Sequence, residues 1–137
     1  MGLECSHGAF RGSYSTFNRL RQAVCFAAGG GSFPPHLVRD ANGVVCDGEG
    51  LPSIDRDLNE ELIYFGDGYS NVTHPGLHAF LTHSDCEGEF SPELCAVIAA
   101  DLSPLLLRIP GDMAAILQRF INGLRRAEKN GEPLTFG

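Results

Sequence analysis

The sequence predicts a mainly α-helical protein in which residues 1–137 form one domain, a small helical bundle with a short β-hairpin or a pair of terminal strands. Three observations support this class. The chain has 137 residues, of which 43% are hydrophobic and 20% charged, typical of one domain with its own core. Several segments repeat apolar residues at helical spacing. Glycine and proline separate those segments. An α+β arrangement is the alternative.

The last helix has the clearest pattern. It begins at Asp112 or at the turn formed by Pro110, and the run from Lys129 to Gly131 supplies a cation and left-handed-tolerant residues that end it. Its apolar residues recur at i, i+3, i+4 and i+7, which predicts one buried stripe. The stripe consists of Met113, Ile116, Leu117, Phe120, Ile121, Leu124 and Ala127.

A second helix is predicted to follow Ser91. The Ser91 hydroxyl can cap the helix, and Pro92 loses no needed N–H group at the first helical position. Pro104 predicts that this helix ends or kinks near residues 103–107. Its inward face is predicted to consist of Leu94, Ile98, Leu102 and Leu105.

Two more helices and a strand pair are predicted. One helix runs from about Ser15 to Ala28, ends at the glycines 29–31, and turns Phe17, Leu20, Val24 and Ala28 inward. A short helix covers Pro75 to Thr82. The terminal segments 3–5 and 133–136 are expected to pair with each other as short strands.

Residues 29–60 are rich in glycine, proline and aspartate. Asn42-Gly43 lies between two short apolar runs, which predicts a β-hairpin. A long irregular segment is uncommon in a compact domain unless it is functional. We therefore expect a small β-excursion or lid.

The charge distribution restricts the possible partners. A net charge of −7 argues against general nucleic-acid or anionic-membrane binding and leaves only a local basic pocket for an anion. The cations gather near both ends of the chain, as Arg11, Arg19 and Arg21 and as Arg119, Arg125, Arg126 and Lys129. The sequence shows no signal peptide or membrane span, so we expect a cytosolic protein with no membrane partner.

Residues 5–21 form the first candidate site. This stretch places hydroxyls, an imidazole and three guanidinium groups near the start of a helix, where free N–H groups and the helix dipole favour anions. We expect Phe10 or Tyr14 to stack on a base. The alternative is that Ser13 or Ser15 caps the helix, Tyr14 packs at its edge, and the arginines form surface ion pairs. The candidate ligand-binding residues are His7, Arg11, Ser13, Tyr14, Asn18, Arg19 and Arg21, joined by His83 and Asp85.

Residues 83–94 form the second candidate site and look like half of an EF-hand loop. His83 at the first ligand position and Leu94 at the last argue against tight calcium binding. No cofactor is expected, but His83, Asp85 and Glu87 are candidate ligands for another divalent metal. The interpretation we favour is an Asp-Gly turn whose carboxylates cap the following helix.

No catalytic motif is present. The sequence has no G-x-S-x-G, H-E-x-x-H or zinc-deaminase pattern. His83 with Asp85 or Glu87, facing His7 across a cleft, could still perform acid–base chemistry. We therefore rank a binding protein above an enzyme.

In both stretches the sequence resembles a group of small bacteriophage and prophage proteins. These proteins combine S-H…S-Y-S-x-F-x-R-x-R with H-S-D-C-x-G-E-x-S-P-E. The matching residues are Ser6, His7, Ser13, Tyr14, Ser15, Phe17, Arg19, Arg21, 83–89 and 91–93, and residues 120–134 are also similar. The resemblance covers about half of the chain, and residues 29–74 look like an insertion. It implies a viral origin and the host cytosol as the location.

These observations leave three functional hypotheses. The leading one is a phage-type protein that sequesters a phosphorylated small molecule, such as a nucleotide-derived host immune signal, by analogy with other small phage proteins. The second is a hydrolase, metal-assisted or using His and Asp, that acts on such a ligand. The third is an acidic inhibitor that binds a host protein. A homo-oligomer with a shared pocket is compatible with each.

Overall fold

The computed structural model describes residues 2–30, 64–66, 68–70, 72–82, 88–109 and 111–137. Within these ranges the chain forms helices α1 (Tyr14–Ala28), α2 (Pro75–Thr82), α3 (Pro92–Leu102) and α4 (Gly111–Asn130), with the 3-10 segments η1 (Ser6–Gly8) and η2 (Ser103–Arg108). The strands are β1 (Gly2–Glu4), β2 (Arg11–Ser13), β3 (Tyr64–Gly66), β4 (Tyr69–Ser70), β5 (Gly88–Phe90) and β6 (Leu134–Phe136). This arrangement confirms the mainly α class with short hairpins.

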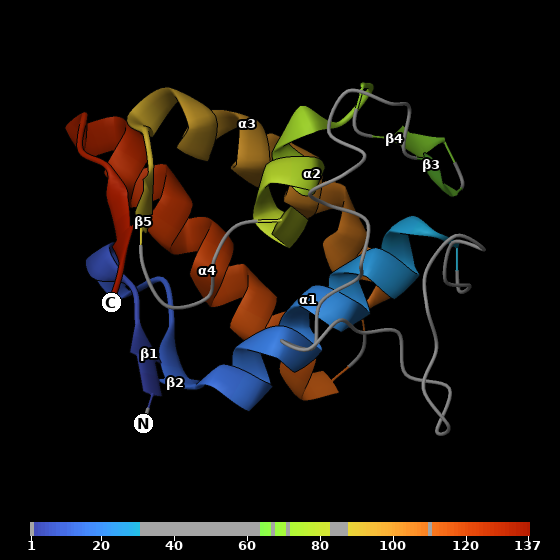
Figure 1. Ribbon diagram of the computed structural model, residues 1–137, viewed down its shortest axis with the longest axis horizontal. Helices are drawn as coiled ribbons and strands as arrows, with labels where there is room; N and C mark the ends of the chain where they lie inside the picture. Colours follow the sequence, from blue (N-terminus) through green and yellow to red (C-terminus); the bar gives the residue numbers. More distant parts are fainter. Residues whose placement is uncertain (1, 31–63, 67, 71, 83–87, 110) are drawn as a thin grey trace.

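The helices pack around α4, the longest of them (Figure 1). Helix α3 packs against both α2 and α4, and α1 contacts α4, α2 and η2. One side chain joins α3 to the start of α2, because Asp101 Oδ2 accepts a hydrogen bond from the Leu77 amide at 3.1 Å. That amide has no partner within its own helix, so Asp101 acts as a cap supplied from a neighbouring helix.

The helix boundaries follow the signals in the sequence. Ser13 Oγ accepts a hydrogen bond from the Thr16 amide at 3.1 Å and caps α1, so the helix begins one residue before the predicted Ser15. Ser91 caps α3 in the same way through the Leu94 amide, as predicted. Helix α3 ends at Leu102 and continues as η2, which confirms the break expected from Pro104.

We expected the two terminal segments to pair mainly with each other, and this prediction is wrong. The main partner of each is another strand. Strand β1 pairs with β2 in the register Gly2↔Ser13 to Glu4↔Arg11, and β6 pairs with β5. The nearby β2 closes only a short loop with β1, which costs less entropy than pairing across the whole chain. The termini still meet, through a bridge between Cys5 and Phe136 and a hydrogen bond from the Gly137 amide to the Glu4 carbonyl.

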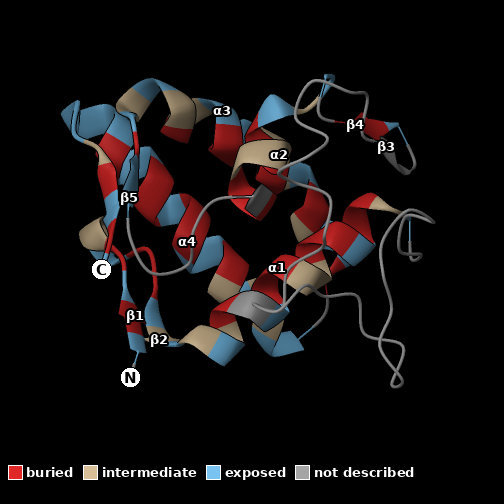
Figure 2. Ribbon diagram, viewed as in Figure 1, coloured by how far each residue is buried: buried red, intermediate tan, exposed pale blue. Residues whose placement is uncertain are grey.

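The buried residues, coloured red in Figure 2, form one core, and an aromatic cluster lies within it. The Phe17 ring is fully buried and lies 5.0 Å from the Phe10 ring and 5.9 Å from the rings of Phe80, Phe120 and Phe136. These rings come from the N-terminal hairpin, α1, α2, α4 and β6, so the cluster links the terminal segments to the bundle. The predicted inward residues of α1 are all fully buried.

The predicted hairpin near Asn42-Gly43 lies outside the described residues, as does the rest of the predicted lid beyond Gly30. Among the helices described, none is both long enough and apolar enough to span a membrane.

Candidate functional site

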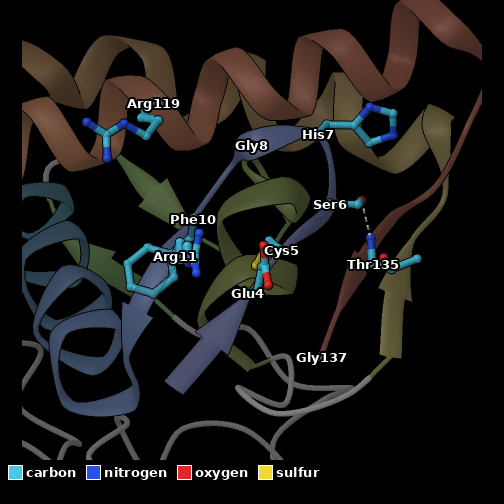
Figure 3. Close-up of a pocket in the computed structure, with 10 residues that line it drawn as sticks. All are labelled: Glu4, Cys5, Ser6, His7, Gly8, Phe10, Arg11, Arg119, Thr135 and Gly137. Atoms are coloured by element: carbon cyan, nitrogen blue, oxygen red, sulfur yellow. Dashed lines mark hydrogen bonds between the residues drawn. The ribbon is translucent and has the colours of Figure 1, made fainter. Parts of the chain in front are cut away.

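A pocket of about 540 Å³ lies where the two ends of the chain meet α4 (Figure 3). The N-terminal hairpin supplies residues 4–8, Phe10 and Arg11 to its lining. Helix α4 supplies Arg119, and the C-terminal strand region supplies Thr135 and Gly137. The pocket therefore exists only when segments more than 100 residues apart in sequence are folded together.

The η1 turn that borders the pocket has an unusual backbone. His7 has φ 59° and ψ 20°, the only positive φ of a non-glycine residue in the described chain, and Gly8 follows at φ 68°. The left-handed region is unfavourable for a residue with a Cβ atom, and such conformations often occur at functional sites. The backbone thereby holds His7 at the edge of the pocket at a conformational cost.

Three contacts hold this turn in place. Arg126 of α4 donates two hydrogen bonds to the His7 carbonyl oxygen, from Nε at 3.0 Å and from Nη2 at 2.5 Å. Ser6 Oγ accepts a hydrogen bond from the Thr135 amide at 2.9 Å, which ties the turn to β6. Ala9, just after the turn, packs so closely on Gly123 that a Cβ atom at position 123 would overlap it.

The charged side chains of the pocket come from two elements. Arg11 and Arg119 are exposed at its surface, and neither forms an ion pair with any carboxylate in the described part of the chain. Glu4 lies opposite Arg11 across the β1–β2 pair. Phe10 is only 4% exposed, so its ring forms an apolar floor and leaves little surface on which a base could stack.

His7 has an acidic neighbour. Its Nε2 atom lies 3.7 Å from Oε1 of Glu132, and the imidazole is 15% exposed whereas the Glu132 side chain is 59% exposed. This distance exceeds that of a hydrogen bond, so the pair is a loose ionic contact that forms when the imidazole is protonated. The imidazole and the Glu132 carboxylate therefore lie side by side at the edge of the pocket.

Cys5 lines the pocket but is not an activated nucleophile. Burial raises the pKa of its thiol to about 12, although the positive charge of Arg21 acts in the opposite direction. The thiol therefore stays protonated at neutral pH, and only the thiolate is strongly nucleophilic. Because Arg21 lowers this pKa, its guanidinium group lies close enough to Cys5 to contribute positive potential there.

The predicted site residues of the first stretch divide into two groups. His7 and Arg11 line the pocket, together with Arg119. Ser13 is engaged as the cap of α1, and Tyr14 packs half-buried against the core. Neither lines the pocket.

The remaining candidates of that stretch lie along α1. Arg19 is exposed and donates a hydrogen bond from Nη2 to Thr16 Oγ1 at 3.3 Å. Arg21 is fully buried, with its guanidinium carbon 4.8 Å from the centre of the Phe17 ring. Asn18 belongs to α1, but its side chain lies outside the described features. Helical geometry thus turns these residues toward different surroundings.

The second predicted stretch lies largely outside the described residues. His83, Asp85, Cys86 and Glu87 all fall there, so their roles as ligand or metal contacts stay predictions. Described structure resumes at Gly88, and the following helix is capped by the hydroxyl of Ser91. Within the described part, no group of three or more His, Cys, Asp or Glu side chains is placed to hold a metal ion.

Four residues of the pocket's lining lie outside the stretch 5–21 that the sequence singled out: Glu4, Arg119, Thr135 and Gly137. One signal was present, because the cations gather in two clusters near opposite ends of the chain. The terminal strand pattern placed those ends near each other. Together, these two features would have predicted that Arg119 lies near Arg11.

No protein-family model, no curated protein and no solved structure matches this chain. The resemblance to phage proteins therefore stays a prediction from the two motifs. The functional argument rests on the geometry of the pocket.

Proposed function

We propose that the protein binds a phosphorylated small molecule in the pocket between the N-terminal hairpin, α4 and β6. The observation that carries this proposal is that Arg11 and Arg119, from distant parts of the sequence, line one pocket beside His7. A guanidinium group presents paired N–H donors that match the oxygens of a phosphate group. Two such groups in one pocket provide donors that suit a phosphate.

The charged residues that line the pocket favour an anion. They are two exposed arginines, Arg11 and Arg119, and one carboxylate, Glu4, so the lining carries a net positive charge. The buried Arg21 adds positive potential at Cys5.

The size of the pocket suits a ligand of nucleotide or sugar-phosphate dimensions. Its volume of about 540 Å³ falls within the range of small-molecule sites, roughly 300–1,000 Å³. The apolar ring of Phe10 forms the floor and the polar groups surround it. Such an open site has room for a small phosphorylated molecule.

Sequestration is the role that we propose for this binding, in line with the analogy to small phage proteins that capture nucleotide-derived host signals. Cys5 does not supply a nucleophile near neutral pH, because burial raises the pKa of its thiol to about 12. One observation favours a hydrolase as the second candidate. His7 is held in a strained conformation next to Glu132, an arrangement that suits a general base.

Native mass spectrometry with a mixture of nucleotides and sugar phosphates tests the proposal and separates the two candidates. Sequestration predicts a bound phosphorylated molecule that is released unchanged by heat denaturation. A processed product would support the hydrolase. Failure of every phosphorylated compound to bind would reject both and leave the predicted interaction with a host protein to be tested.

A further inference from the structure

One acidic residue, Glu4, lies among the cations of the pocket. Glu4 and Arg11 are directly opposite each other in the antiparallel β1–β2 pair. Directly opposed residues of an antiparallel pair place their side chains on the same face, with Cβ atoms roughly 5 Å apart. Both residues line the main pocket and also a smaller adjoining one of about 280 Å³. Any group bound by Arg11 therefore lies near the Glu4 carboxylate.

A carboxylate at this position has opposite effects on two kinds of anion. A bare polyanion bound by Arg11 and Arg119 meets a like charge at Glu4, which weakens its binding. A ligand with a hydroxyl or amino group next to its phosphate can instead donate hydrogen bonds to the carboxylate, which accepts them on two oxygens. Carboxylates recognise ribose hydroxyls in this way at nucleotide sites.

The polar groups are also arranged unevenly around the pocket. Figure 3 shows Arg119, on α4, at one side of the pocket and Ser6 and Thr135 at the other side. Ser6 Oγ accepts a hydrogen bond from the Thr135 amide, which leaves the O–H groups of Ser6 and Thr135 as donors for a ligand on that side. The phosphate side and the hydroxyl side of the pocket are thus distinct.

We infer that Glu4 determines the ligand class and selects a sugar phosphate or nucleotide over an inorganic polyphosphate. In this arrangement Arg11 and Arg119 bind the phosphate while Glu4 accepts hydrogen bonds from sugar hydroxyls. The inference rests on the proposed phosphate-binding function and adds the chemical group that must accompany the phosphate.

The experiment uses isothermal titration calorimetry of the full chain with two probes, ribose 5-phosphate and pyrophosphate. Glu4→Gln removes the charge and keeps the shape of the side chain. We expect it to bind pyrophosphate roughly 3- to 10-fold more tightly and ribose 5-phosphate more weakly by a similar factor. Glu128→Gln is the matched control, because it removes one exposed carboxylate on α4, outside the pocket. The control should leave both affinities unchanged.

A second measurement compares two sugar phosphates. The wild-type protein should bind ribose 5-phosphate more tightly than 2-deoxyribose 5-phosphate, which lacks one hydroxyl, and Glu4→Gln should reduce that difference. If Glu4→Gln shifts both probes in the same direction, or if the deoxy sugar binds equally well, the inference fails while phosphate binding stands. If neither probe binds the wild-type protein, the proposed function fails as well.

Discussion

Arg126 of α4 donates two hydrogen bonds to the carbonyl oxygen of His7, and these bonds connect the longest helix to the left-handed turn beside the pocket. A charged donor with two parallel N–H groups holds a carbonyl more firmly than a single neutral one. The conformation of the η1 turn therefore depends on a residue that does not itself line the pocket.

Replacing Arg126 tests this connection. We expect Arg126→Ala to lower the free energy of unfolding by about 1–2 kcal/mol and to weaken phosphate binding several-fold, because the turn loses its anchor. Arg125→Ala is the control on the same helix, since Arg125 Nη2 bonds to Ser103 Oγ, away from the pocket. Chemical denaturation and calorimetry measure the two effects. Equal loss of binding in both variants would contradict the anchoring role.

The strained conformation of His7 gives a second prediction. His7→Gly and His7→Ala both remove the imidazole and its contact with Glu132, but only alanine keeps a Cβ atom in the left-handed region. We expect His7→Gly to be more stable than His7→Ala by roughly 1 kcal/mol and both to bind phosphate more weakly than the wild type. Thermal unfolding gives the comparison. Greater stability of the alanine variant would show that the turn is not strained.

The close contact between Ala9 and Gly123 gives a third prediction. Alanine is favoured over glycine inside a helix by up to about 1 kcal/mol, yet a Cβ atom at position 123 would overlap Ala9. We expect Gly123→Ala to destabilise the protein by about 1–3 kcal/mol. Adding Ala9→Gly should restore part of this loss, because it removes the overlapped Cβ atom of Ala9, although the Ala9 Cα at 2.6 Å remains. Additive losses in the double variant would mean that the two residues do not compete for the same space.

The buried thiols give a prediction for alkaline pH. Burial raises the pKa of both Cys5 and Cys25 from 9.0 to about 12 in the folded protein. Unfolding releases protons from these thiols above pH 9, so the stability they contribute is complete below pH 9 and is lost as the pH rises toward 12. Urea denaturation at pH 7 and pH 10.5 should show that the wild-type protein loses stability at the higher pH. Cys25→Ala should lose less stability between the two pH values. If it loses as much as the wild type, Cys25 is not a cause of the loss.

The helices were predictable from the sequence because their signals are local. The stripe from Leu117 to Ala127, the Ser91 cap and the break at Pro104 each act within a few residues, and each appears in the structure. The strand partners were less predictable. Strands of three residues show little alternation of apolar and polar residues. The sequence alone leaves β1 able to pair with a nearby strand or with a distant one.

The candidate site was predictable only in part, because contacts between segments that are distant in the sequence leave no local signal. His7 and Arg11 were identified because they belong to one continuous stretch of polar residues. Arg119 was seen only as a member of a cationic cluster, since its place in the pocket depends on how α4 crosses the hairpin. Arg21 has the same residue type as Arg11, but the helical period turns its side chain into the core.

The most direct test of the pocket is an amide NMR titration of the full chain with ribose 5-phosphate, repeated for Arg119→Gln and Lys129→Gln. Both substitutions remove one positive charge from an exposed position of α4, but only Arg119 lines the pocket. Phosphate binding in the pocket predicts shifts clustered at residues 4–11 and around Arg119, with affinity reduced about tenfold or more in Arg119→Gln and unchanged in Lys129→Gln. Shifts located elsewhere, or an equal loss of affinity in the two variants, would contradict the proposed site.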